Sequence, residues 1–149
     1  MFEERFEDFV GLIASIEKEI QRIKTAELAR FGLRAGDLMC IYNLQKHPEG
    51  LTSAELARVA GIDRAAVSRV VSRLSADGFV EVGDDEGATS GRYRAPLRLT
   101  EMGHAVMVEV DDIIRNVVSE AGSGLSPSNR EAMYSSLSSV LDHLKTISQ

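Results

Sequence analysis

Three arginines recur along one stretch of the sequence, residues 63–82, which reads DRAAVSRVVSRLSADGFVEV. Arg64, Arg69 and Arg73 are separated there by alanines, valines and serines. A guanidinium carries a permanent charge and five N–H donors, which match the oxygens of phosphates and the acceptors of a guanine base. If the stretch is helical, its small side chains let the backbone come close to the surface that the arginines contact. The spacing therefore favours binding to a nucleic-acid duplex.

The charge of the chain is unevenly distributed. Its 149 residues include 17 Lys and Arg against 23 Asp and Glu, which gives a net charge of −6. Residues 51–100 hold seven Arg and seven acids and are neutral, so the acidic excess lies in the flanks. Within this neutral part, residues 58–73 have four arginines and one aspartate, and residues 88–99 have three arginines and no acid. Two short positive patches in an acidic chain indicate a local site for a polyanion.

The residues around the first patch predict two helices joined by a tight turn. Thr52 and Glu55 fit a capping box for a short helix that runs to residue 60. Gly61 suits the turn, and Asp63 can cap the next helix, which begins at Arg64. This arrangement is a helix-turn-helix candidate. Its predicted inner residues are Leu56, Ala57, Ile62, Val67, Val70, Val71 and Leu74. The outer face of the second helix is predicted to carry Arg64, Ala65, Ser68, Arg69 and Ser72, with Arg73 at its edge.

A β-hairpin is predicted directly after the second helix. Gly78 ends the helix, residues 79–82 read as a strand, and a loop rich in glycine and acids follows. Apolar and basic residues alternate in the return segment, residues 92–99, and Pro96 predicts that it is an edge strand. Its basic face consists of Arg92, Arg94 and Arg98. A hairpin in this position is a wing, and its arginines suit a minor groove or its phosphates.

Both ends of the chain predict long amphipathic helices. Apolar residues recur at steps of four and three over residues 2–23, 106–117 and 133–147, as in helices that pack through a narrow seam. The N-terminal seam consists of Phe2, Phe6, Phe9, Ile13, Ile16, Ile20 and Ile23. Residues 38–44, in contrast, predict a mostly buried helix. Because no third layer covers the terminal seams, we expect them to associate two copies of the chain, with a plain intramolecular core as the alternative.

Several classes of function lack the residues that they need. There is no CxxC or HExxH spacing and the three histidines are scattered, so we expect no metal and no cofactor. We find no nucleophile with a base at a usable spacing and no phosphate-binding glycine loop, and we expect no enzyme. Cys40 is expected to be a buried core residue, with redox sensing as the alternative. An acidic start and the absence of an 18-residue apolar run predict a cytoplasmic protein that does not enter a membrane.

With a helix-turn-helix, a wing and long helices at both ends, the chain resembles the MarR family of bacterial transcriptional regulators over nearly its whole length. The resemblance rests on GLTSAELARVAGIDRAAVSRVVSRLSADGFV, residues 50–80, and LRLTEMGHA, residues 97–105. It implies a mainly α fold with a small β-hairpin wing. Residues 34–100 would form a winged helix-turn-helix, and residues 1–33 and 101–149 a helical dimerisation region. It also implies a homodimer on a pseudo-palindromic operator in double-stranded DNA, usually a repressor, released by a small-molecule or oxidant effector.

The resemblance further assigns individual residues to DNA. Those that fall where the family's recognition helix meets the major groove are Arg64, Ala65, Ala66, Ser68 and Arg69. Arg73 falls where a backbone or wing contact is usual. The wing departs from the family pattern, because Asp84, Asp85 and Glu86 come first and the arginines follow after a loop that looks longer than usual. The wing contact is therefore expected from Arg92 and Arg94.

A second hypothesis belongs to another class of function. In it the winged helix is a protein-interaction module, and the acidic surface, with the acids of residues 84–86, docks a basic partner. This version predicts little binding to any duplex even at low salt. The operator, the regulated genes and the effector do not follow from the sequence.

Overall fold

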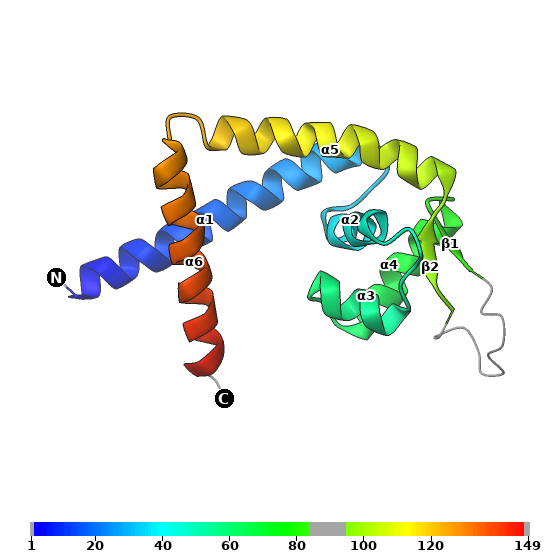
Figure 1. Cartoon of the computed structure of the whole chain (residues 1–149), viewed down its shortest axis with the longest axis horizontal. Coiled ribbons are helices and arrows are strands. Elements are labelled where there is room, and N and C mark those ends of the chain that lie inside the picture. Colours follow the sequence, from blue (N-terminus) through cyan, green and yellow to red (C-terminus); the bar gives the residue numbers. More distant parts are fainter. Residues whose placement is uncertain (1, 84–94, 148–149) are drawn as a thin grey trace. The chain divides into compact units, whose positions relative to one another are not determined.

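The computed structural model describes residues 2–83 and 95–147, without the side chains of residues 2–4 and 6 (Figure 1). Its elements are α1 (Phe2–Ala29), the short 3₁₀ helix η1 (Ala35–Asp37), α2 (Leu38–Lys46), α3 (Ser53–Ala60), α4 (Arg64–Ala76), β1 (Val80–Val82), β2 (Leu97–Leu99), α5 (Glu101–Ala121) and α6 (Pro127–Ile147). Helices dominate, and the two strands form one hairpin. The predicted mainly α fold with a small β-hairpin is confirmed.

The chain forms two compact units, residues 1–111 and 112–149. The first contains α1 to β2 and the start of α5, and the second contains the rest of α5 and α6. No helix in the described ranges combines the length and apolar character needed to cross a bilayer. The expected division between a winged helix-turn-helix at residues 34–100 and flanking dimerisation regions stays a prediction.

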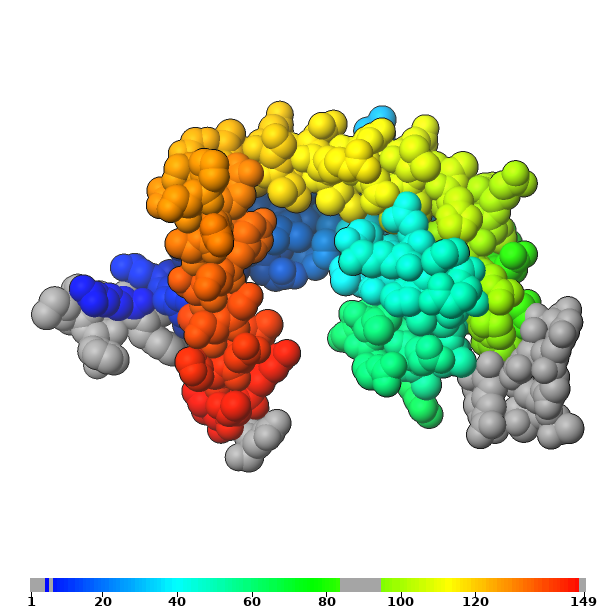
Figure 2. Space-filling model, viewed as in Figure 1, coloured from blue at the N-terminus to red at the C-terminus, as the bar shows by residue number. Residues whose placement is uncertain are grey.

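The core of the first unit lies where α2, α3, α4 and β2 meet. Helix α3 packs against both α2 and α4, and α2 also contacts β2. Figure 2 shows α2 and α3 as adjoining surfaces without a gap between them. The largest fully buried side chains are Ile41, Leu44, Leu56, Leu74, Met107, Val67, Val110, Asp37 and Cys40. This set includes one charged residue, Asp37, which the apolar pattern of the sequence did not single out.

Local hydrogen bonds fix the helix-turn-helix as the sequence predicts. The Thr52 hydroxyl accepts a bond from the backbone N–H of Glu55 at 3.2 Å and donates one to the Glu55 carboxylate at 3.0 Å. Gly61 takes a left-handed conformation, with φ of 72°, and its N–H donates to the carbonyl of Ala57. The Asp63 carboxylate then accepts a 2.7 Å bond from the N–H of Ala66 and starts α4. These hydrogen bonds confirm the predicted start and end of α3 and the predicted start of α4.

The hairpin follows α4 directly. Strands β1 and β2 are antiparallel, with Val80 opposite Leu99. The predicted apolar face of the return segment is confirmed at Ala95, Leu97 and Leu99, which are buried. The prediction of an edge strand is confirmed, because the sheet in the described residues has two strands and β2 pairs along one side with β1. On its other side Leu97 forms an isolated bridge, exchanging backbone hydrogen bonds with Leu51 at 2.7 and 3.1 Å. Pro96 lies just before these bonds, so its missing N–H does not interrupt them.

Helix α5 begins against the hairpin at a very close contact. The Thr100 hydroxyl accepts a bond from the N–H of Gly103, and Gly103 faces the backbone of Phe79. A Cβ at Gly103 would lie 2.2 Å from the Phe79 carbonyl oxygen. Only glycine therefore lets α5 approach the hairpin so closely.

The helices at the two ends of the chain expose apolar side chains. On α1, the side chains of Phe9, Ile13, Ile16 and Ile20 are 41–47% exposed. On α6 no residue is buried. Its exposed apolar residues are Met133, Tyr134, Leu137, Leu141, Leu144 and Ile147. The seam residues Phe2 and Phe6 belong to the side chains that the structure does not describe.

Candidate nucleic-acid interface

Helix α4 has one buried and one exposed face. Val67, Val70 and Leu74 are buried and hold the helix onto the lobe formed by α2, α3 and the hairpin. The predicted outer residues Arg64, Ala65, Ser68 and Arg69 are exposed, and Ala66 is half-buried. The period of the α-helix therefore presents the small and basic residues together on the outside of the lobe.

Arg64 and Arg69 keep their guanidinium groups available. Neither takes part in an ion pair within residues 2–83 and 95–147. A separation of five positions places the two side chains about 140° apart around the helix and about 7.5 Å apart along it. Two charged groups spread in this way can reach a base edge and a backbone phosphate at the same time.

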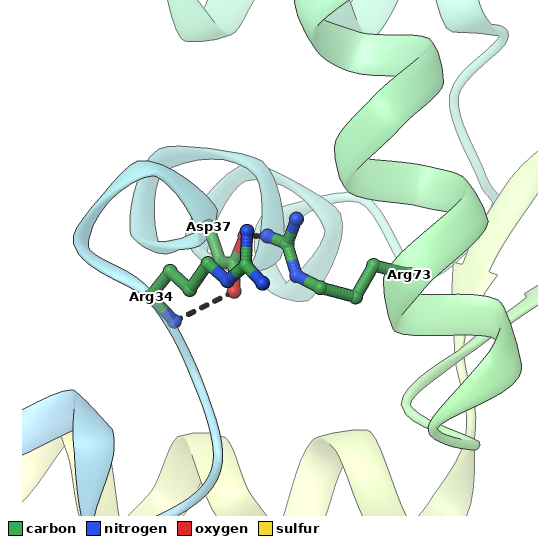
Figure 3. Close-up of polar contacts among 3 residues, drawn as sticks. All are labelled: Arg34, Asp37 and Arg73. Carbon is green, nitrogen blue, oxygen red and sulfur yellow. Dashed lines mark hydrogen bonds and ion pairs between the residues drawn. The ribbon is translucent and has the colours of Figure 1, made fainter.

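Arg73 lies in a different environment from the other two arginines. Its Nη2 donates to Oδ1 of Asp37, whose side chain is 0% exposed, while Arg73 itself is 26% exposed (Figure 3). The other carboxylate oxygen of Asp37 accepts a 2.8 Å bond from the backbone N–H of Arg34. Asp37 therefore joins the segment before α2 to the recognition candidate α4.

Burial and the neighbouring charges both affect the pKa of Arg73. Burial lowers the pKa of Arg73, the neighbouring Arg34 lowers it further, and Asp77 acts in the opposite direction. The guanidinium still remains charged, because arginine does not lose its proton in proteins. Its Nε is buried and has no hydrogen-bond partner among the described residues. Asp37 is thus the charge that compensates Arg73.

Arg98, the basic residue nearest the base of the wing, is also held by the lobe. Its Nε and Nη2 both donate to the backbone carbonyl of Glu49, at 3.1 and 2.9 Å. Glu49 lies in the turn between α2 and α3, so this fork ties β2 to the turn that leads into the helix-turn-helix. Arg92 and Arg94, the expected wing contacts, lie outside the described residues.

The sequence contained a signal for Asp37 that its polar character concealed. Asp37, Ile41 and Leu44 are spaced by four and three residues, which places all three on one face of a helix. The two apolar members are buried, and so is Asp37. A charged residue in register with a buried face needs a partner, and Arg73 supplies it.

Cys40 is fully buried in α2. Burial raises the pKa of its thiol from 9.0 to about 11. A buried, protonated thiol is a poor nucleophile, which agrees with the expected core role rather than with redox sensing.

Comparison with known proteins identifies relatives of the helix-turn-helix. A family model described as the MarR family matches residues 31–88. The HTH-type transcriptional repressor Rv2887 of Mycobacterium tuberculosis is 33% identical over 91 residues, which cover 61% of this chain and 63% of the relative. The HTH-type transcriptional regulator Rv1719 of the same organism is 36% identical over 77 residues, which cover 52% of this chain and 27% of the relative. The match thus spans less than two thirds of either relative.

Solved structures share the fold over most of the chain. The transcriptional regulator SlyA has a TM-score of 0.80 at 20% identity and covers 92% of this chain and 94% of its own. A DNA complex of Staphylococcus aureus MepR has a TM-score of 0.78 at 21% identity, with coverages of 89% and 94%. Staphylococcus aureus MarR in complex with salicylate and kanamycin has a TM-score of 0.77 at 17% identity, with coverages of 97% and 95%.

Proposed function

We propose that this chain is a sequence-specific DNA-binding repressor of the MarR family of winged helix-turn-helix regulators and that it acts as a homodimer. The observation that carries the proposal is the outer face of α4, where Arg64 and Arg69 stand exposed beside small residues in a chain of net charge −6. An exposed basic face on the second helix of a helix-turn-helix fits the major groove in width and in charge.

Each chain would place one α4 in a major groove. The proposed contacts of α4 are Arg64, Ala65, Ala66, Ser68 and Arg69, and those of the wing are Arg92 and Arg94. A dimer would read two half-sites of a pseudo-palindromic operator about one helical turn apart. Because each phosphate contact releases counterions, its affinity should fall steeply as the salt concentration rises.

The proposed dimer is supported by the terminal helices. The exposed apolar residues of α1 and of α6 would lose their contact with water in an interface between two chains. This supports a dimer built by the ends of the chain, with the winged helix left free for DNA.

The proposal of a repressor released by a small molecule is supported by two of the comparisons. One relative is named a transcriptional repressor, and one structure with this fold was solved with salicylate and kanamycin. The burial of Cys40 favours a small molecule over an oxidant as the effector. As part of the same proposal, the protein is a non-catalytic regulator that acts in the cytoplasm, as the transcriptional regulators among its relatives support.

A binding experiment tests the proposal. Duplexes are first selected from a random-sequence library by the full-length protein, and fluorescence anisotropy then compares the enriched duplex with a scrambled one at two salt concentrations. We expect saturable binding that prefers the enriched duplex and weakens with salt. If no duplex is enriched and none binds at low salt, DNA binding is excluded, and the protein-interaction hypothesis would be pursued by pull-down.

A further inference from the structure

Asp37 connects two parts of the lobe that are far apart in the sequence. Its two carboxylate oxygens accept from different elements: Oδ2 from the N–H of Arg34, at 2.8 Å, and Oδ1 from Arg73 on α4. In Figure 3 the side chain of Arg73 extends away from α4 toward the start of α2, where Asp37 lies. With its side chain 0% exposed, Asp37 depends on these bonds to compensate its charge.

This bond constrains α4 in a way that its apolar contacts do not. Val67, Val70 and Leu74 hold the helix against the lobe by burial, which has little directional preference. A charge-assisted hydrogen bond from a planar guanidinium is directional. A guanidinium roughly 8 Å from the helix axis moves by about 3 Å when the helix rotates by about 20°, which is enough to break a hydrogen bond to a base.

The same bond limits what Arg73 can do on its own. One Nη is committed to Asp37, and the Nε is buried without a partner among the described residues. Arg69, only four residues earlier on the same helix, is exposed and outside every ion pair of the described ranges. The two arginines therefore differ in role although they differ little in position.

We infer that Asp37 is a positioning residue for DNA recognition: by holding Arg73, it fixes the rotation of α4 that presents Arg64 and Arg69 to the major groove. The inference rests on the proposed function and replaces the DNA contact expected of Arg73. Arg73 then contributes to sequence preference through Asp37 and adds little to the general attraction for phosphates.

Three variants of the full-length protein test this inference: Asp37→Asn, Arg73→Gln and the double variant. In Asp37→Asn the side-chain amide can accept only one of the two bonds, because its NH₂ group would face a donor. Removing one partner of a buried ion pair leaves the other charge unpaired and can unfold the lobe. The double variant is therefore essential, because it removes the ion pair and leaves neither charge behind. Arg115→Gln is the matched control, because Arg115 is 75% exposed and its only ion pair among the described residues is a 3.6 Å contact with Asp112.

The readout is anisotropy on the enriched and scrambled duplexes over a range of salt, with folding checked by circular dichroism. Each single variant is expected to lose about tenfold affinity for the enriched duplex, with unchanged affinity for the scrambled duplex and an unchanged salt slope. The double variant should lose the same tenfold rather than a hundredfold, because one interaction is removed in all three. The Arg115 control should bind as the wild type does.

Two results would overturn the inference. One is that Arg73→Gln weakens both duplexes equally and reduces the salt slope by about one, as loss of a phosphate contact does, while Asp37→Asn binds normally. The other is normal sequence preference in the folded double variant. Failure of the proposed function is distinguishable, because the wild-type protein would then prefer no duplex before any variant is measured.

Discussion

The outer face of α4 and the apolar faces of the terminal helices are both exposed in the single chain, but they are exposed for different reasons. Arg64 and Arg69 are charged groups that water solvates well, so α4 can stay folded in their presence without a ligand. The isoleucines of α1 are apolar, and burying their exposed surface would contribute roughly 25 cal/mol of stabilisation for each square ångström removed from water. The outer face of α4 is therefore stable without a ligand, whereas the apolar faces of the terminal helices need a second packing surface for stability.

The buried sides of these helices show the same difference. The inner face of α4 is completed within one chain, with Val67 0% and Leu74 1% exposed. Helix α6 has no buried residue at all. The lobe that carries α4 is therefore packed by its own residues, while the ends of the chain lack a second packing surface. The predictions below test this contrast, beginning with the largest expected effect.

Placing a charge in the seam of α1 should break the dimer. Ile16 is 47% exposed, and in an interface it would be buried, so Ile16→Glu leaves a carboxylate without a partner. We expect the dissociation constant of the dimer to rise by about 100-fold or more, as measured by sedimentation. Operator affinity should fall with it, because two linked half-site contacts become one.

Ala14→Glu is the matched control for this prediction. It adds the same charge to the same helix, about 130° around the axis from the seam. If Ala14→Glu dissociates the protein as strongly as Ile16→Glu does, or if neither has an effect, the seam is not the interface.

Removing a guanidinium from α4 should weaken DNA binding and leave the dimer intact. Arg69→Ala is expected to reduce affinity for the enriched duplex by about 10- to 100-fold, to the level of the scrambled duplex, because a base contact contributes roughly 1–3 kcal/mol. The dimer should stay intact, since Arg69 lies on the surface of the lobe and forms none of the ion pairs in the described ranges. Anisotropy and sedimentation on one sample measure both properties, and retained sequence preference would exclude this face of α4.

A glycine-to-alanine substitution should lower the thermal stability where α5 contacts the hairpin and raise it in α1. Gly103→Ala places a Cβ 2.2 Å from the Phe79 carbonyl and should cost about 2 kcal/mol, which lowers the thermal midpoint by roughly 4–8 °C. A Cβ at Gly11, within α1, meets nothing within 4 Å. Gly11→Ala should therefore raise the midpoint by roughly 2–4 °C, through the better helix propensity of alanine. Calorimetry at one protein concentration compares them, and equal shifts would contradict the contrast in packing.

The sequence predicted the parts of the lobe that depend on neighbours along the chain. The cap at Thr52, the turn at Gly61 and the cap at Asp63 each use hydrogen bonds that span three or four residues. Their residue types and spacing determine the structure almost alone. For the same reason, the buried inner face of α4 could be predicted from the helical spacing of its apolar residues.

The sequence did not predict what depends on distant partners. The ion pair between Arg73 and Asp37 was not predicted, because helical period relates only near neighbours and the two residues are 36 positions apart. The backbone bridge between Leu97 and Leu51 was not predicted either, although β2 is an edge strand as expected. Met39 is exposed although it lies within a mostly buried apolar run. Each of these cases depends on which segments meet in space.

The smallest effect on DNA binding is expected from chemical modification at Cys40, which is buried in the lobe. Its pKa is raised from 9.0 to about 11, so at pH 8 the folded protein should contain about 100-fold less thiolate than the unfolded chain. Native protein should therefore react with iodoacetamide about 100-fold more slowly than protein in guanidinium chloride, and burial should slow it further. Because the folded state keeps the Cys40 proton more tightly than the unfolded chain does, the stabilisation from the protonated thiol is complete below pH 9 and is lost as the pH rises toward 11.

Hydrogen peroxide should likewise leave the complex between the protein and the enriched duplex intact. Rapid labelling of the native protein, or release by peroxide that Cys40→Ala abolishes, would show that the lobe opens at α2 and would restore an oxidant as the effector.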